Sequence, residues 1–381
     1  MRVYFLFFLC FSSGALAAQE TFTHFGGMRL HAGSNLGIHA NLINLAPLEI
    51  NKGKFGFYGE EPQEITGEYP LSVYDAEIAS NYPVFFQIGL NIGHNLNLIS
   101  GDLVTAPLSE NIITAFKAES FVVGASDFSK IDGTVQAEII EEFEFPVGDL
   151  NQLRPLKFKT SAGNAILRCT YFRTDPTASE AFGILNPLAK SRQLQTISQK
   201  EFWHLAGNGT GSVTISWNAE SDLAAVSNSL ENIEIIGWHT GKQSWQPIGI
   251  TNRTGDLVSG SATSENFVPD DFQVLTFGGS RVPDKFYTLD NYYLSPNNDG
   301  VNDFLEIEEL LDAPKNTLKI YNRNGILVFS RQNYVREFEG YSNTNNGVFQ
   351  RNSGLPEGVY FYVAYLQESN TVFQGFLFLD R

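Results

Sequence analysis

In the first part of this 381-residue sequence, the apolar residues fall into short clusters separated mainly by glycine and asparagine. Clear examples are Leu36-Gly37-Ile38, Leu48-Glu49-Ile50, Phe55-Gly56-Phe57-Tyr58 and Ile88-Gly89-Leu90. No long helical periodicity accompanies them, and short strands at a spacing of about eight to ten residues are typical of a parallel β-solenoid. We therefore predict a β-solenoid-like stalk over residues 19–150, with an irregular β-sandwich as the alternative.

The apolar pattern changes near Pro146 and Gly148, which interrupt a strand ladder. Beyond them the strands are longer and alternate cleanly, as in Val213–Trp217 and Ile233–Trp238. This alternation favours an antiparallel β-sandwich of immunoglobulin-like type over residues 151–282. With 31 Phe, 15 Tyr and 34 Gly in the chain, the fold class predicted for the whole protein is all-β.

The last ninety or so residues combine turn signals with alternating strands. The run Ser295–Asp303 is rich in turn-forming residues, and Asn322-Arg323-Asn324-Gly325 separates two alternating apolar segments, which predicts a β-hairpin. The turn Leu355-Pro356-Glu357-Gly358 precedes a strand, and a last strand ends just before Arg381.

In their order, these elements resemble the gliding-motility-associated C-terminal domain, the type B sorting domain of Bacteroidetes type IX secretion substrates. The matching elements are Ser295–Asp303, Ile320–Gly325, Phe338-Glu339-Gly340 and Leu355–Tyr362, with Arg381 last. Asn324 and Phe338 stand where the family usually has tryptophan, which weakens aromatic packing but keeps the turn chemistry. The resemblance implies an Ig-like β-sandwich sorting domain over residues 283–381.

What the resemblance implies about function is export: the type IX secretion machinery is the partner, and the sorting domain is the address that it reads. The residues expected to carry this sorting signal come from the hairpin, the second turn and the chain end: Asn322, Arg323, Gly325, Leu355, Pro356, Gly358, Tyr360 and Arg381. The resemblance does not imply catalysis.

The first 18 residues have the pattern of a secretory signal peptide. Arg2 gives a short positive segment, Val3–Phe11 is apolar, and Ala15-Leu16-Ala17 is a small-residue cleavage site. We expect cleavage after Ala17 or Ala18, no membrane-spanning segment in the mature chain, and, after type IX export, a protein that is secreted or held on the outer cell surface.

The formal net charge of −17 argues against nucleic acid and anionic membrane surfaces as partners, because both attract basic faces. Cys10 leaves with the predicted signal peptide, so the mature chain keeps only Cys169 and has no intrachain disulfide. Cys169 follows an apolar segment, which indicates a buried thiol.

Alternating oxygen-bearing side chains around Gly300 suggest a calcium loop, with Asn297, Asp299 and Asp303 as ligands. The alternative is an Asx-turn in which these side chains bond to their own backbone. Apart from this calcium ion, the sequence predicts no cofactor.

Tryptophan positions suggest a second ligand class. Trp217 and Trp238 lie inside predicted strands and are expected in the core, whereas Trp245 lies beside a turn and is the best candidate for an exposed glycan platform. The acidic stretch Glu138–Glu144 alternates with apolar residues, so a solvated strand explains it better than a paired-carboxylate glycosidase site.

No zinc-type histidine spacing, nucleophile elbow or phosphate-binding loop occurs in the sequence. The sequence therefore predicts a non-enzymatic secreted or surface protein, structural or adhesin-like, which contacts surface glycans or other surface proteins. The alternatives are a glycan-binding module and a polysaccharide-degrading enzyme carried on the solenoid.

Overall fold

The computed structural model describes residues 21–48, 52–149, 151–191, 193–280, 285–288 (backbone), 291–311, 313, 315–345, 352, 354–367 and 371–381. The predicted signal peptide, residues 1–18, lies outside the described residues. The chain divides into two compact units, Met1–Arg281 and Val282–Arg381, whose hydrophobic cores are separate.

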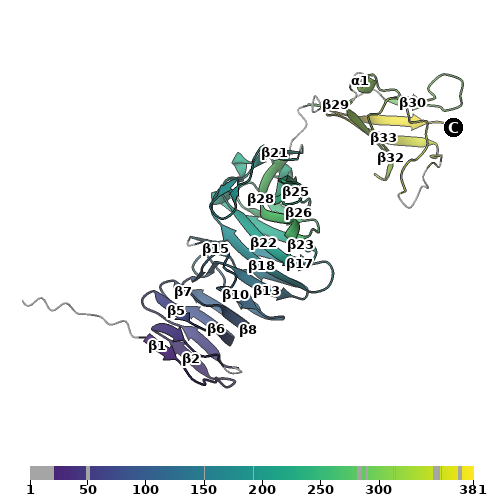
Figure 1. Cartoon of the computed structure of the whole chain (residues 1–381). Helices are drawn as coiled ribbons and strands as arrows, with labels where there is room; N and C mark the ends of the chain where they lie inside the picture. Colours follow the sequence, from purple (N-terminus) through teal and green to yellow (C-terminus); the bar gives the residue numbers. More distant parts are fainter. Residues whose placement is uncertain are drawn as a thin grey trace, which may run out of the picture. The chain divides into compact units, whose positions relative to one another are not determined.

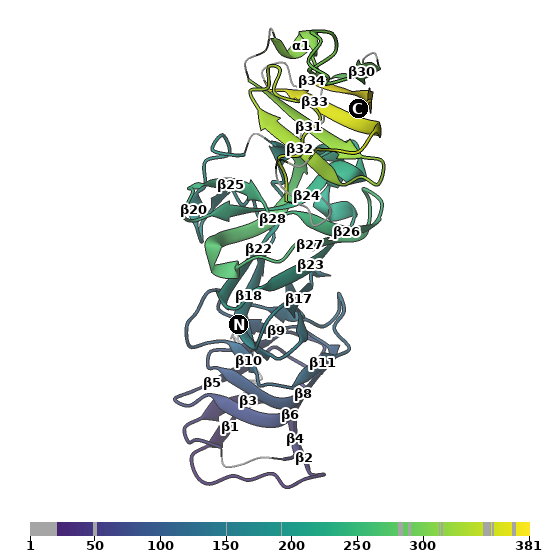
Figure 2. The same ribbon diagram turned by 90° about the vertical axis from the view of Figure 1, so that its right-hand side faces the viewer.

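The first unit begins as a parallel β-solenoid in which each turn adds one strand to each of two sheets (Figures 1 and 2). One sheet is ordered β1 (Thr21–His24), β3 (Asn41–Asn44), β5 (Gln63–Gly67), β7 (Val84–Phe86), β9 (Leu103–Thr105) and β12 (Ile131–Asp132). The other begins with β2 (Asn35–Ile38), β4 (Lys54–Phe57), β6 (Leu71–Ala79), β8 (Leu90–Ser100), β10 (Thr114–Phe116) and β13 (Val135–Ile139), and β11 (Phe121–Val123) pairs with β8. The prediction of an N-terminal solenoid is confirmed.

The short apolar clusters form this solenoid because each strand sends alternate side chains between the two sheets. Phe55 and Phe57 of β4 and Ile65 of β5 are fully buried there. At the corners, buried amide side chains satisfy backbone groups that no strand can pair: the Gln63 side chain donates to the carbonyls of Ile38 and Ala40. Buried polar atoms need such partners, so these amides stabilise the turns.

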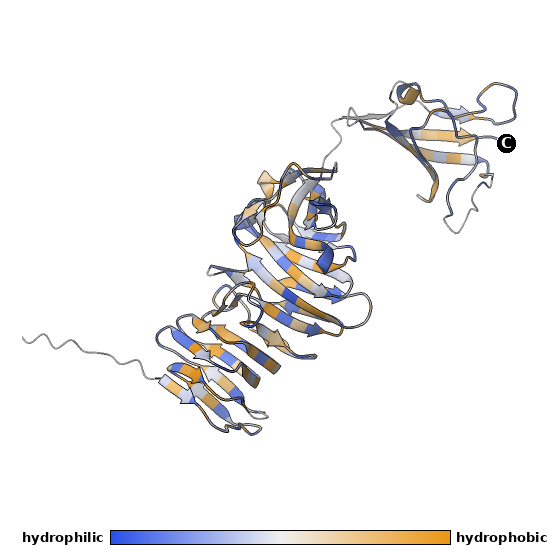
Figure 3. Cartoon of the chain, viewed as in Figure 1, coloured by the Kyte–Doolittle hydropathy of each residue, from blue (hydrophilic) through white to orange (hydrophobic). Residues whose placement is uncertain are grey.

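Strand pairing becomes antiparallel where β13 meets β18 (Ala165–Phe172), and the same sheet continues to a total of thirteen strands. Its further strands are β22 (Phe202–Asn208), β28 (Phe272–Ser280), β24 (Ile233–His239) and β25 (Ser244–Pro247), with β21 (Leu194–Ile197) paired to β28. A five-stranded antiparallel sheet has the order β14 (Glu142–Phe145), β17 (Leu156–Thr160), β23 (Gly211–Trp217), β27 (Gly260–Ser264) and β26 (Ile250–Gly255). Hydrophobic and polar residues alternate along many of these strands (Figure 3).

The remaining elements of the first unit are short. Two small ribbons pair β15 (Gly148–Asp149) with β16 (Gln152–Leu153) and β19 (Ala178–Ser179) with β20 (Gly183–Ile184). The 3₁₀ turns are η1 (Ala219–Ser221), η2 (Leu223–Ala225), η3 (Leu230–Asn232) and η4 (Pro269–Asp271).

The solenoid and the antiparallel sandwich share one hydrophobic core as well as one sheet. The core runs from Ile38 in the first turns through Phe145 and Leu156 to Phe277 in β28. The two architectures therefore lie in one compact unit, and the domain boundary predicted at residue 150 stays a prediction. A shared sheet leaves no exposed edge at the change of architecture, so the strands continue through it.

The second unit is built on one six-stranded sheet, and its small helix is α1 (Glu308–Leu311). The sheet order is β29 (Lys285–Thr288), β34 (Thr371–Leu379), β33 (Gly358–Leu366), β31 (Asn316–Asn322) and β32 (Leu327–Gln332), and β30 (Tyr292–Leu294) also pairs with β34. Among the described residues, irregular segments that carry Leu305, Tyr334 and Phe338 cover one face of this sheet and complete the core.

Candidate functional site

The predicted sorting residues meet at one end of the C-terminal sheet. Asn322, at the end of β31, pairs in register with Tyr360 of β33. Gly358, at the start of β33, pairs with Leu379 at the end of β34. The hairpin tip, the second turn and the chain end are therefore neighbours, although up to sixty or so residues separate them in sequence.

The hairpin tip is held by the Asn322 side chain. Its Oδ1 accepts hydrogen bonds from the backbone N–H groups of Asn324 (2.9 Å) and Ile326 (3.0 Å). Gly325 has φ +76°, a conformation that glycine adopts without strain, and its N–H donates to the Asn322 carbonyl. Asn322 and Gly325 thus shape the turn, while Arg323 and Asn324 are exposed.

The second turn is fixed from inside the core. Leu355 is buried, and its N–H donates to the carbonyl of Gly340 at 2.9 Å. The Tyr360 hydroxyl donates to the Pro356 carbonyl at 2.8 Å, and Gly358 has φ +144°. Burial raises the pKa of Tyr360, while the nearby Arg381 charge lowers it, so the hydroxyl remains a hydrogen-bond donor at neutral pH.

Arg381 closes the site. Its Nη2 donates to the Gly340 carbonyl at 2.7 Å, the same carbonyl that Leu355 uses. The guanidinium carbon lies 4.7 Å from the centroid of the Tyr341 ring, a cation–π distance. A Cβ on Gly354 would come within 2.4 Å of Arg381 Nη1, so this glycine makes room for the guanidinium. The last residue is therefore docked against the two preceding motif elements.

Comparison with protein families decides what this arrangement is. Residues 286–379 match the CHU_C type IX secretion signal domain.

The chain carries a type IX secretion signal domain at its C-terminus.

This signal domain implies export by the type IX machinery, interaction with that machinery, and secretion or cell-surface localisation, as the sequence predicted. No curated protein and no solved structure matches the chain. Among the described residues, no helix has the length and apolar character needed to cross a membrane.

One family difference lies in the core of the signal domain. Phe338, in place of the usual tryptophan, is fully buried and packs edge-to-face on Phe329 with ring centroids 4.9 Å apart. Asn324, the other substituted position, is exposed at the hairpin tip. The core therefore packs around the smaller Phe338 ring, and Asn324 in place of tryptophan reduces the exposed aromatic surface without changing the core.

The predicted calcium loop is closed by its own hydrogen bonds. Asp303 accepts from the N–H groups of Asn298 (2.7 Å) and Gly300 (2.8 Å), and Asp299 accepts from Val301 N–H (2.8 Å). The hydrogen bond from Val301 N–H, together with one from the Asn297 side chain, lowers the pKa of Asp299. This is the Asx-turn geometry of the alternative, and within the part of the chain described no three His, Cys, Asp or Glu side chains cluster as a metal site. Calcium binding by Asn297, Asp299 and Asp303 stays a prediction.

The prediction that Trp245 is exposed is wrong. Trp245 lies in β25 and is fully buried, and it packs edge-to-face on Trp238 in β24 at 5.7 Å. Because β25 pairs with β24, the Trp245 ring packs into a small hydrophobic core that is separate from the main one. Trp245 is therefore not a glycan platform. Trp217, Trp238 and Cys169 are buried as predicted.

Sequence reasoning missed two buried ion pairs in the first unit. The fully buried Lys130 ammonium contacts both Asp102 carboxylate oxygens at 2.9 and 3.0 Å. Arg154 Nε donates to Glu201 at 2.9 Å, and Glu201 also accepts from the Tyr171 hydroxyl. Arg154 and Glu201 are 47 positions apart, so no local sequence pattern indicates that they form an ion pair.

The environment of a neighbouring carboxylate, Asp132, disfavours its ionised form. Asp132, on the last strand of the six-stranded solenoid sheet, has its pKa raised to about 6 by burial and by repulsion from Asp102 and Asp149. These acidic groups lie where the solenoid passes into the sandwich, and they give this junction a pH dependence.

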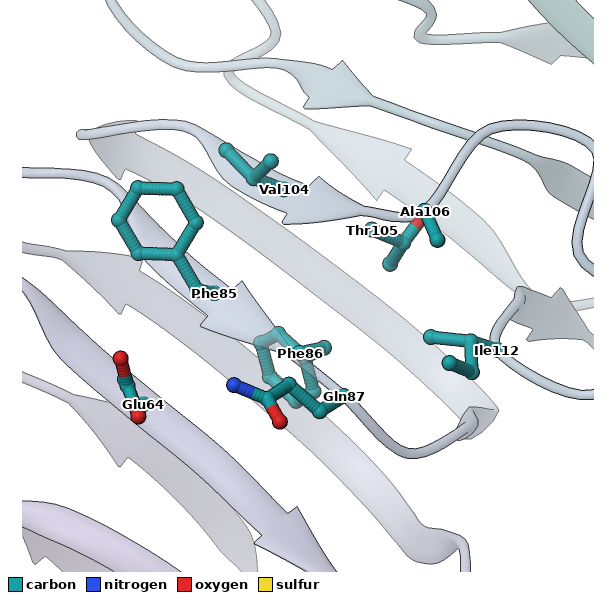
Figure 4. A pocket seen from close by; sticks show the side chains of 8 residues that line it. All are labelled: Glu64, Phe85, Phe86, Gln87, Val104, Thr105, Ala106 and Ile112. Carbon is teal, nitrogen blue, oxygen red and sulfur yellow. The ribbon is translucent and has the colours of Figure 1, made fainter.

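The outer faces of the solenoid carry two further features. On one sheet, a groove of about 390 Å³ is lined by Glu64, Phe85, Phe86, Gln87, Val104, Thr105, Ala106 and Ile112 (Figure 4). Glu64 is the one ionisable side chain of this lining, and a paired-carboxylate hydrolysis site needs two.

On the other sheet, the Tyr58 ring lies over the backbone of two adjacent strands. A Cβ on Gly56 would come within 2.2 Å of the ring and a Cβ on Gly37 within 3.0 Å. The Tyr58 hydroxyl donates to Glu77 at 2.7 Å. Burial opposes ionisation of Glu77, but hydrogen bonds from Tyr58, Lys54 and Asn97 outweigh it and lower its pKa.

Proposed function

We propose that the exported part of this protein is a non-enzymatic, structural or adhesin-like module presented outside the cell. The C-terminal signal domain exports the chain, and residues 21–280 form the body that is delivered. The observation that supports this role is the continuous sheet and core that join the solenoid to the sandwich. A solenoid without a joint at its end behaves as a stiff spacer, which suits display at a distance from the surface.

The charge and site chemistry of the body fit a binding role better than a catalytic one. The net charge of −17 disfavours anionic polymers as ligands. The groove on the solenoid holds a single carboxylate, Glu64, beside Phe85 and Val104. Such a surface favours contact over acid–base chemistry.

The test uses the full chain in the bacterium that produces it. Cells that lack the protein should attach less to abiotic and polysaccharide-coated surfaces, and the full chain should restore attachment. A chain without residues 286–381 should accumulate behind the outer membrane and restore nothing. Release of reducing ends or unsaturated sugars from polysaccharides by the purified full chain, with attachment unchanged, would replace this role by a hydrolase or lyase.

Glycan binding is a second candidate function, and the Tyr58 surface favours it. An aromatic ring that lies over glycine backbone offers its outer side for stacking on a sugar ring, and Glu77, Lys54 and Asn97 stand beside it as hydrogen-bonding groups. Because Gly37 and Gly56 have no Cβ, the Tyr58 ring can lie against the backbone of their two strands.

A glycan array with the full chain tests this candidate. Tyr58→Ala should abolish binding, Tyr58→Phe should retain most of it because the ring remains, and Tyr82→Ala, an exposed tyrosine elsewhere on the solenoid, is the matched control. Binding that is absent in the wild type, or equal in Tyr58→Ala, contradicts it.

A further inference from the structure

One face of the C-terminal sheet is covered and the other carries exposed aromatic residues. The alternation of β33 sets this division: Tyr360 and Tyr362 point into the core, whereas Val359 and Phe361 are 41% and 48% exposed. In β34 the same alternation buries Leu377 and leaves Phe376 40% exposed.

Cross-strand register gathers these outward residues into one patch. Phe361 lies between Tyr321 of β31 and Phe376 of β34. On the next outward row, Phe378 lies between Val359 and Tyr293, and the Phe378 and Tyr293 rings stack at 6.1 Å with planes 11° apart. We define these six residues as the aromatic face: Tyr293, Tyr321, Val359, Phe361, Phe376 and Phe378.

The aromatic face has a sharp boundary. The next row on the same side of the sheet is Lys319, Val363 and Gln374, and both polar residues are exposed. This row separates the aromatic face from Tyr365 and Val372, which pair on the following row, and the aromatic face lies at the end of the sheet where Asn322 pairs with Tyr360 and Gly358 with Leu379. This is the end at which the sorting residues meet.

The hydrophobic core of the unit lies on the other side of the sheet, with Leu318, Tyr362 and Leu377, and contains none of these six residues. A contiguous set of exposed aromatic side chains, rimmed by polar residues, marks a surface that another molecule covers. Aromatic residues on a rigid sheet lose little conformational entropy on binding and are typical of protein interfaces.

We propose that the aromatic face is the surface by which a protein of the type IX secretion machinery holds this domain, through a complementary apolar surface of its own. The proposal rests on the export function. The occupant follows from position: the match to the signal domain, residues 286–379, contains all six residues, and the face borders the sorting residues. The buried motif residues Leu355 and Tyr360 then shape the domain, and Phe361, between two buried tyrosines, makes the contact.

The test compares export of full-length variants in the producing bacterium. Phe361→Thr/Phe376→Thr removes the centre of the face, and threonine keeps the strand propensity. The extracellular and surface fraction should fall about tenfold or more, with accumulation in the periplasm, since two central aromatic contacts are lost. Lys319→Thr/Gln374→Thr, on the same side of the same sheet, is the matched control and should be exported like the wild type.

Two further measurements, thermal unfolding and self-association, separate the possible outcomes. Thermal unfolding of each purified full-length variant identifies a folding defect, and if the double variant is unstable, the single Phe361→Thr variant is compared in its place. Export of the double variant at the wild-type rate overturns the proposal, while the export function stands if the wild type leaves the cell. A concentration-dependent dimer of the wild type that Phe361→Thr/Phe376→Thr abolishes, without loss of export, assigns the face to a second copy and also overturns the proposal.

Discussion

Replacing Arg381 by alanine tests whether the chain end is part of the folded signal domain. The change removes the hydrogen bond from Nη2 to the Gly340 carbonyl and the cation–π contact with Tyr341. A hydrogen bond to a charged group contributes about 1.5–3 kcal/mol, and about 1 kcal/mol at a part-buried site such as this, where water still screens the charge. The aromatic contact adds about 0.5–1 kcal/mol, so the free energy of unfolding should fall by about 1.5–2 kcal/mol.

A second substitution reaches the same contacts from the other side. Alanine at Gly354 places a Cβ 2.4 Å from Arg381 Nη1. The guanidinium is the far end of a flexible side chain, so it should move away and lose the same two contacts. The cost of Gly354→Ala should therefore be similar to that of Arg381→Ala, and the double variant should be no less stable than either single one.

Thermal unfolding of the full chain measures these costs. The two units have separate cores, so the second unit should give its own transition, and for about 100 residues each kcal/mol shifts the Tm by about 4–8 °C. Arg381→Ala should lower that Tm by about 6–16 °C, whereas Arg323→Ala at the exposed hairpin tip should change it little. Additive costs in the double variant would refute the docking of Arg381 between Gly354 and Tyr341.

Two other predictions concern ions and protons. If the loop with Asn297, Asp299 and Asp303 binds calcium, the Tm of the second unit should be higher in millimolar calcium than in chelator, and an unchanged Tm leaves only the Asx-turn. Asp132 has a folded pKa of about 6 against an ordinary value of 3.8, so its ionisation destabilises the folded state. This destabilisation is absent below pH 3.8, grows as the pH rises, and is complete above pH 6. Asp132→Asn should therefore stabilise the first unit by about 1–3 kcal/mol above pH 6 and leave it unchanged near pH 3.8, and an equal effect at both pH values in denaturant titrations would contradict the assignment.

Local features of the sequence were enough to predict the parts whose structure depends on near neighbours. The clusters around Phe55 and Phe57 predicted solenoid strands because a two-residue period fixes which side chains point inward. The hairpin at Asn322–Gly325 formed as predicted because turn geometry depends on a few consecutive residues, and the type IX secretion signal was evident from the order of such elements.

Tertiary structure alone decided which surfaces are covered. Trp245 follows a turn, yet the pairing of β24 with β25 buries it against Trp238. No local pattern in the sequence indicates that these two residues are neighbours. The pairing of Arg154 with Glu201, the passage of one sheet from solenoid to sandwich, and the docking of Arg381 on Gly340 all join residues far apart in the chain. Strand period and turn type are set by local sterics, whereas burial and charge pairing depend on what the rest of the chain places alongside.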